Sequence, residues 1–167
     1  MPLEEKWDKL LDGYWVNVIG TYALLKELGA VDKGVDWSVK VNAKMLPRRA
    51  RVAFDTLKPI AAGIAFNQLV DNYVYSLQRT LSLQDFELNK VSDREATLII
   101  NNCPILKRVR SLIKKTGLDI EPKAICEIES KINQGLAKEL GLEIVTELKE
   151  DGCINNLKLW YMLIFST

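Results

Sequence analysis

Cysteine and glutamate are the residue types through which this chain could best do chemistry. Cys103 lies between a predicted strand and a predicted helix, where unpaired backbone N–H groups and the helix dipole favour a thiolate. Lys107 and Arg108 follow in the same helix and add positive charge. We therefore expect Cys103 to be the most reactive thiol and a candidate catalytic nucleophile. The alternative is a small buried cysteine with no chemical role.

Glu129 is the second candidate. In the predicted helix 122–140, Ile125, Ile128 and Ile132 belong to the buried face, and Glu129 lies about 40° from the centre of that face. A buried carboxylate needs a proton, a cation or a hydrogen-bond partner. Glu129 is therefore a candidate general base, metal ligand or ligand anchor. The alternative is an edge glutamate whose stem covers apolar surface while its carboxylate reaches water.

The cysteines offer a third kind of chemistry. Cys103, Cys126 and Cys153 are far apart in sequence and include no CxxC pair. If the turn before Cys153 lies near the start of the Cys103 helix, three thiolates and a carboxylate or water could bind zinc tetrahedrally. Their spacing does not specify such a site. A zinc site and three structural cysteines are both open interpretations.

The chain contains no histidine. Serine–histidine triads, cysteine–histidine dyads and histidine-ligated zinc are therefore excluded within one chain. Catalysis would have to use cysteine, a carboxylate, lysine or tyrosine.

Charge and hydropathy limit the partners. Lys and Arg number 23 against 22 Asp and Glu, so the net charge of +1 creates no global field. The basic cluster Arg48, Arg49 and Arg51 lacks interleaved aromatic residues, so we expect a solvated helix face and no nucleic-acid partner. An acidic N-terminal segment and the lack of an uncharged run of about 18 residues predict a cytoplasmic protein with no membrane span.

The spacing of apolar residues predicts one α+β domain over residues 1–167, with a helical half (1–82) and a sheet-containing half (83–167). The N-terminal helices should form a layer packed on a four-stranded antiparallel sheet with two intervening helices, in the order ββααββ. The expected helices of the first half are 3–28, 36–57 with a break near Pro47, and 59–81 starting at Pro59. The expected elements of the second half are strands 86–91 and 96–100, helices 104–116 and 122–140, and strands 142–149 and 154–165.

The first helix has two faces that are not polar. We expect its broad apolar face to be buried, and a second strip with Gly13 and Gly20 lies opposite. Glycine inside a helix costs about 1 kcal/mol relative to alanine, so this pair indicates that another backbone approaches closely. The strip could be covered within the chain, but we predict a homodimer contact there. The expected buried residues are Trp7, Leu10, Leu11, Tyr14, Trp15, Val18, Tyr22 and Leu25.

Four short motifs resemble those of a known group of proteins. They are LDGYW at 11–15 in the first helix, NCP at 102–104, ICE at 125–127 and DGC at 151–153. In this order they resemble motifs of the domains related to L-2-amino-thiazoline-4-carboxylic acid hydrolases. They are also similar to the wider 4-vinyl-reductase, or hydrocarbon-binding, domains, whose fold is shared with TRAPP transport-particle subunits.

The resemblance implies an α+β domain, often dimeric, with a small-molecule pocket between helices and sheet. It also implies that Cys103, Cys126 and Cys153 can bind metal. The chain departs from the pattern at Asn155, where relatives usually have an aromatic residue, and it lacks histidines that some relatives use. These departures weaken the case for hydrolase activity more than the case for the fold.

Three functions remain open at this point. The leading one is a small-molecule binding or sensing domain, whose expected partner is a small-molecule ligand. In the apolar pocket that the resemblance implies, Glu129 would be the polar anchor, and the expected lining residues are Trp15, Tyr22, Phe66 and Tyr73. The second is a hydrolase of a small heterocycle, in which Cys103 or a metal-bound water attacks and Glu129 transfers the proton. The third is a structural interaction module that dimerises through Gly13 and Gly20.

Overall fold

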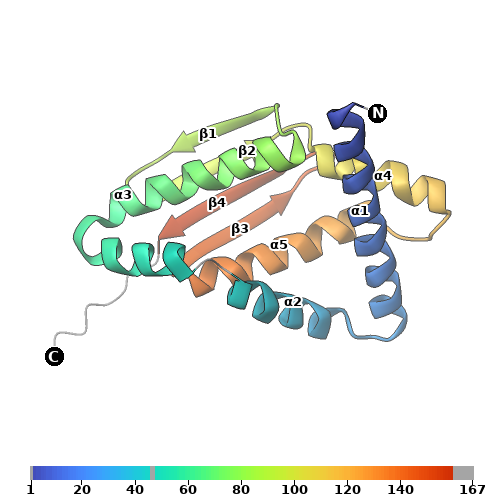
Figure 1. The fold of residues 1–167 in the computed structure, drawn as a ribbon, viewed down its shortest axis with the longest axis horizontal. Helices are drawn as coiled ribbons and strands as arrows, with labels where there is room; N and C mark the ends of the chain where they lie inside the picture. The colour runs from blue at the N-terminus through green and yellow to red at the C-terminus, as the bar shows by residue number, and fades with distance from the viewer. Residues whose placement is uncertain (1, 46–47, 160–167) are drawn as a thin grey trace.

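The structure is a computed structural model that describes residues 2–45 and 48–159, without the side chains of residues 48–62 and 79–80. Its class is α+β, and the second half has the order ββααββ, so both predictions are confirmed. Figure 1 shows the arrangement of these elements. The elements are α1 (Leu3–Glu27), α2 (Val31–Met45), α3 (Arg48–Leu81), β1 (Phe86–Lys90), β2 (Glu95–Ile100), α4 (Pro104–Thr116), α5 (Pro122–Glu139), β3 (Leu142–Leu148) and β4 (Cys153–Leu159).

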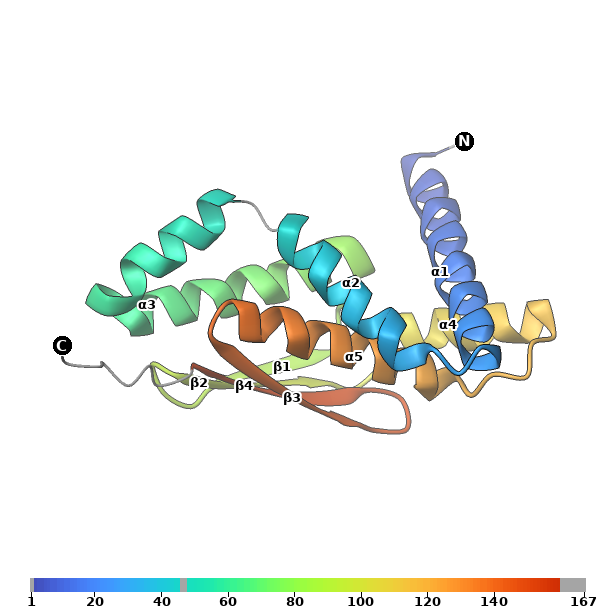
Figure 2. The ribbon, with the colours of Figure 1, turned by 90° about the horizontal axis from the view of Figure 1, so that it is seen from below.

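The four strands form one antiparallel sheet in the order β1-β2-β4-β3. Side chains along β2 alternate between buried and half-buried, as expected for a sheet with one covered face. The helices α2, α3 and α5 lie on the same side of this sheet (Figure 2). The inner strand β4 begins at Cys153, which is aligned with Ile100 of β2 on one side and with Leu148 of β3 on the other. These three residues mark the end of the sheet nearest to α4.

The helix boundaries in the first half differ from the prediction. Gly29, with a φ of 61°, ends α1, and α2 starts directly afterwards at Val31. The expected break near Pro47 falls outside the described residues. The boundary expected at Pro59 is wrong, because α3 continues through it from Arg48 to Leu81. Figure 2 shows that α3 changes direction along its length; proline removes one helical hydrogen bond and bends a helix without necessarily ending it.

The apolar residues form two clusters. The larger one lies between α3 and the sheet and includes Phe66 and Leu98, both fully buried. The smaller one joins α1, α4 and α5 and includes Trp15, Val109 and Ile125. The helix α1 therefore rests on α4 and α5 and stands across the end of the sheet (Figure 1). In the described part of the chain, no helix has both the length and the apolar character needed to cross a membrane.

Arg108 of α4 holds α1 in this position. Its Nη1 lies 2.7 Å from Asp12 Oδ1, and its Nη2 lies 2.7 Å from Asp8 Oδ1. Nη1 also donates a hydrogen bond of 3.0 Å to the backbone oxygen of Asp8. The planar guanidinium thus joins two acids one helical turn apart. Because Arg108 is engaged with α1, its expected contribution to the charge around Cys103 is largely cancelled by these two carboxylates.

Candidate functional site

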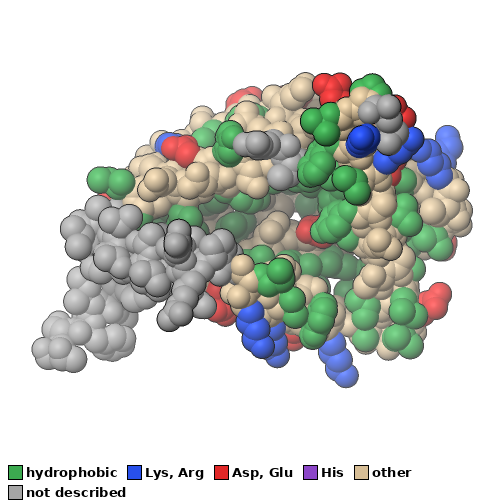
Figure 3. Space-filling view, viewed as in Figure 1, with side chains coloured by type: hydrophobic (Ala, Val, Ile, Leu, Met, Phe, Trp, Pro, Cys, Tyr) green, Lys and Arg blue, Asp and Glu red, His purple; other side chains and the backbone are tan. Residues whose placement is uncertain are grey.

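A cavity of about 490 Å³ lies where α1, α3, α4 and α5 meet the covered face of the sheet. Its volume is in the range of small-molecule sites. Figure 3 shows a hollow between α1 and the other helices on this side of the molecule. Its lining is mostly apolar, with a few polar groups from α5, β3 and β4. The polar lining residues include Ser76, Glu129, Ser130, Asn133, Thr146 and Asn155.

Most of the predicted site residues meet at this cavity, and two do not. Tyr22 lines a second cavity of about 280 Å³ between α1, α2 and α5. Phe66 is fully buried in the core between α3 and the sheet and is not among the lining residues of either cavity. The apolar sequence around Phe66 indicated that its side chain is buried. It did not indicate whether the side chain packs in the core or lines a cavity. The predicted residues that do line the cavity are Trp15, Tyr73, Cys103, Cys126, Glu129 and Cys153.

The turn before β4 brings two of the cysteines to one wall. Because Cys153 is aligned with Ile100, the start of β4 lies beside the end of β2. The Cys103 N–H donates a hydrogen bond of 2.7 Å to the backbone oxygen of Asp151, which attaches the start of α4 to this turn. Gly152 makes the approach possible, because a Cβ there would lie 1.8 Å from the backbone oxygen of Ile100.

Arg110 of α4 holds the same turn from outside. Its Nη1 lies 2.5 Å from Asp151 Oδ1, and its Nη2 donates a hydrogen bond of 2.6 Å to the backbone oxygen of Glu150. The hydrogen bond from Arg110 lowers the pKa of Asp151. The N-terminus of α4 and the β3–β4 turn are therefore joined by both backbone and side-chain contacts.

Burial keeps two of the thiols protonated at neutral pH. It raises the pKa of Cys126 to about 12, with additional effects from neighbouring Cys103 and Cys153. It raises the pKa of Cys153 to about 11. Asn155, which is buried, donates a hydrogen bond of 3.4 Å to the Cys153 Sγ and partly opposes that shift. Neutral thiols are poor nucleophiles and poor metal ligands.

The three cysteines share the cavity without forming a metal-binding geometry. Among the described residues, no group of three or more histidine, cysteine, aspartate or glutamate side chains could hold a metal ion. The thiols of Cys126 and Cys153 would also have to lose protons before binding zinc. A zinc site at Cys103, Cys126 and Cys153 therefore stays a prediction from sequence without geometric support.

Glu129 lies in the wall between the two cavities and lines both of them. Burial raises the pKa of its carboxyl group. Within the described part of the chain, no hydrogen bond or ion pair compensates the burial of this carboxylate. Glu129 is thus a mostly buried acid that faces open space on two sides.

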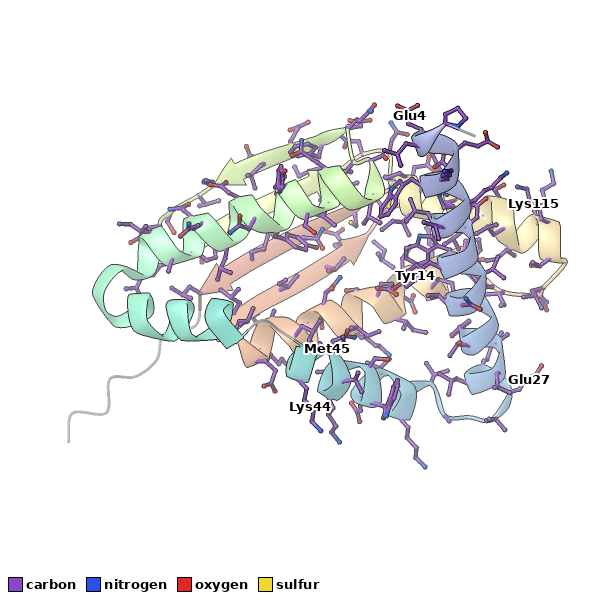
Figure 4. All side chains as sticks on the ribbon, in the orientation of Figure 1. Glu4, Tyr14, Glu27, Lys44, Met45 and Lys115 are labelled. Atoms are coloured by element: carbon purple, nitrogen blue, oxygen red, sulfur yellow. The ribbon has the colours of Figure 1, made fainter. Side chains whose placement is uncertain are left out.

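Aromatic residues of α1 line the same cavity as this carboxylate, and Tyr14 is close enough to interact with its charge. Trp7, Tyr14 and Trp15 line the larger cavity, and the rings of Tyr14 and Trp15 are 5.2 Å apart in an edge-to-face arrangement. Figure 4 shows Tyr14 on the side of α1 that faces the other helices. Burial and then the charge of Glu129 raise the pKa of Tyr14. The prediction that Trp7 and Tyr14 are buried is wrong, because they are 43% and 54% exposed at the edge of the cavity. No signal in the sequence indicated that they border a cavity.

No protein-family model matches this chain, and no curated protein is similar enough to indicate a relationship.

We expect Cys103 to react first with iodoacetamide at neutral pH. Cys126 and Cys153 have raised pKa values. Cys103 is more buried than either of them, but it is the residue preceding α4 and lies in the field of the helix dipole. Peptide mapping after partial alkylation measures the order of labelling. Faster labelling of Cys126 or Cys153 in the folded protein would show that the position at the start of α4 does not control reactivity.

Proposed function

We propose that this chain is a small-molecule binding domain whose ligand has a compact apolar body and one basic nitrogen. The observation that carries this proposal is Glu129, a mostly buried carboxylate that lines the cavity and has no compensating partner among the described residues. A cationic ligand supplies the missing partner. The resemblance to hydrocarbon-binding domains agrees with an apolar ligand.

Charge and shape at the cavity favour an ammonium group over other head groups. Burying a carboxylate alone is costly, and a bound cation offsets that cost. Trp7, Tyr14 and Trp15 line the same cavity, and an aromatic ring that presents its face to a cation contributes up to about 2 kcal/mol when water is excluded. An anionic ligand would be repelled by Glu129, and a neutral one would leave its charge uncompensated.

A hydrolase is less well supported than a binding domain. Of the candidate nucleophiles, Cys126 and Cys153 are protonated at neutral pH because burial raises the pKa of each. Only Cys103 is left, and no described hydrogen bond connects its thiol to Glu129 or to another base. A nucleophile without an adjacent base or an activating charge is weak.

The homodimer predicted from the first helix is also part of this proposal. Gly13 and Gly20 are both exposed, and a Cβ at either would meet no described atom within 4 Å. The strip is therefore open to a second chain.

The proposal is tested with three ligands that share one apolar body: 4-phenylbutylamine, 4-phenylbutanol and 4-phenylbutyrate. We expect the amine to bind at least about tenfold more tightly than the alcohol, equivalent to about 1.4 kcal/mol, and the carboxylate to bind most weakly. Isothermal titration calorimetry measures the three affinities at one pH. Equal affinities, or a preference for the carboxylate, would contradict the proposal.

A further inference from the structure

The helix α1 carries a row of side chains that the described part of the protomer leaves uncovered. Consecutive members are alternately four and three residues apart, which is the heptad spacing of a coiled-coil helix. The large apolar members are between 43% exposed (Trp7) and 82% exposed (Leu3). The two polar members, Asn17 and Thr21, are exposed as well. We call this row, with the C-cap residue of α1 as its last member, the α1 seam; it consists of Leu3, Trp7, Leu10, Tyr14, Asn17, Thr21, Leu24 and Leu28.

The α1 seam is prominent on the surface. Figure 3 shows hydrophobic side chains gathered toward both ends of α1, and Figure 2 shows α1 rising away from the sheet. A helix of 25 residues is roughly 37 Å long. Apolar rows of this length on a protein surface generally mark an interaction site.

The seam also borders both cavities. Trp7 and Tyr14 line the larger cavity, and Tyr14, Asn17 and Thr21 line the smaller one. A helix laid along the seam would therefore cover the open side of both cavities. The cavity described above lacks one wall in the isolated protomer.

We propose that the α1 seam binds the α1 seam of a second copy in antiparallel orientation, and that the partner's helix forms the missing wall of the cavity. The consequence of this dimer for ligand binding rests on the proposed function, because the partner's helix would complete the same cavity. The seam residues alternate between the two core positions of the heptad, a and d. In an antiparallel pair, each a position of one helix lies opposite a d position of the other. In the centred register, Leu3 faces the partner's Leu28, Trp7 the partner's Leu24, Leu10 the partner's Thr21, and Tyr14 the partner's Asn17.

Residues that flank the seam fit the same register. Lys6, Gly13, Gly20 and Glu27 follow each other at intervals of seven residues along one edge of the seam. In the antiparallel register Lys6 meets the partner's Glu27, and Gly13 meets the partner's Gly20. Neither charged side chain has an ion pair within the described residues, and the glycines leave room for close approach.

A parallel pair would lose these matches. In a parallel pair, the residues along one edge of the seam lie against the residues along the other edge of the partner's seam. Lys6 would then face the partner's Leu11 instead of the partner's Glu27. The central Asn17 also favours one register, since a polar residue in an apolar seam is satisfied only opposite a suitable partner. In the antiparallel register that partner is the hydroxyl of Tyr14.

Sedimentation velocity at micromolar concentration tests the dimer directly. We expect a dimer for the wild type and a monomer for Leu10→Glu, because a carboxylate would be buried in the seam without a cation. Leu10 is 66% exposed in the protomer, so the change should not disturb folding; Leu24→Glu is the second variant. The matched control is Trp37→Glu, which changes a 67% exposed apolar residue of α2 and should leave the dimer intact. A monomeric wild type, or a dimer that Trp37→Glu breaks and Leu10→Glu does not, would overturn the proposal.

Charge reversal tests the orientation. We expect Lys6→Glu and Glu27→Lys each to weaken the dimer, and the double variant to restore it, because the antiparallel register pairs these two positions. Equal weakening by the double variant would overturn the antiparallel register.

The alkylation rate of the cavity cysteines tests the closure without any ligand, so its outcome is independent of the proposed function. Covering the open side of the cavity should protect Cys103, Cys126 and Cys153 from iodoacetamide. We expect monomeric Leu10→Glu to be alkylated at least about tenfold faster than the wild type and Trp37→Glu. Equal rates in monomer and dimer would show that the partner does not close the cavity.

Discussion

Replacing Glu129 with glutamine is expected to abolish the preference for 4-phenylbutylamine and to leave the folded protein at least as stable at neutral pH. The carboxylate is the group that a cationic ligand needs, and it is also a group that folding disfavours, because burial penalises its charge. Removing the charge should weaken amine binding by about a hundredfold. The free energy of unfolding should rise by up to about 1 kcal/mol.

The sign of the pH dependence follows from the direction of the pKa shift. Burial raises the pKa of Glu129 above its ordinary value of 4.5, so the folded protein holds a proton that the unfolded chain has released. Between the unfolded and the folded pKa, stability therefore falls as the pH rises. The stability advantage of Glu129→Gln should be absent below pH 4.5, appear across that window and stay constant above it. Amine binding should strengthen as the pH rises through the folded pKa, because the ionised carboxylate binds the cation.

The matched control is Glu127→Gln, which removes a charge from an exposed position of the same helix. Denaturant melts and calorimetric titrations of both variants across pH measure stability and binding. Comparable losses of amine binding in the two variants, or a Glu129→Gln protein that is less stable at neutral pH, would contradict the assignment of Glu129 as the anchor.

Replacing Gly152 with alanine is expected to be the most destabilising single substitution in the turn before β4. The new Cβ would lie 1.8 Å from the Ile100 backbone oxygen and 2.8 Å from its carbonyl carbon. Both contacts are with backbone, so relief requires β2 and β4 to separate. We expect a loss of about 3 kcal/mol or more in the free energy of unfolding, measured by urea denaturation.

The control for this prediction is Gly34→Ala in α2, where the nearest neighbours of the new Cβ would be Leu25 side-chain atoms, the closest at 2.5 Å. The Leu25 side chain can shift, and alanine is a better helix former than glycine by about 1 kcal/mol, so we expect a much smaller loss of stability than for Gly152→Ala. If Gly152→Ala unfolded at the same urea concentration as the wild type, the close approach of the β4 turn to Ile100 could not be an essential part of the fold.

The second half of the chain was predictable because its signals are local. Pro104 and Pro122 each occupy the first turn of a helix, and Gly117 ends α4 with a φ of 69°. Such residues act through their own backbone preferences, which do not depend on distant contacts. The sequence also predicted that Cys153 lies near Cys103 if the two strand pairs form one sheet. They do, and the pairing of β4 with β2 brings the two cysteines together.

The first half was less predictable because its boundaries and buried faces depend on tertiary contacts. Proline at position 59 is equally compatible with a helix start and a bend, and here α3 continues through it. The apolar face of α1 is wide enough to include both Trp15, which is buried, and Leu10, which is exposed. Periodicity identifies apolar faces but does not tell which surface covers each of them.

The candidate site likewise combines a feature that a local sequence pattern predicts with features that depend on tertiary contacts. The angular position of Glu129 on its helix predicted a conflict between burial and charge, and the structure places it in the wall of two cavities. The contribution of Trp7 and Tyr14 to the larger cavity arises from the angle between α1 and α5. That angle is set by long-range contacts such as those of Arg108 with Asp8 and Asp12, and no local pattern encodes it.

The protonation of Glu129 is the most direct test of the central claim, that this buried carboxylate anchors a basic ligand. Carbon-13 NMR of its side-chain carboxyl group, followed across pH, measures the pKa in the free protein and in the protein saturated with 4-phenylbutylamine. The claim predicts a pKa above 4.5 in the free protein and a lower pKa in the complex, because the bound ammonium favours the ionised form. A pKa at or below 4.5 in the free protein, or one that the amine leaves unchanged, would contradict it.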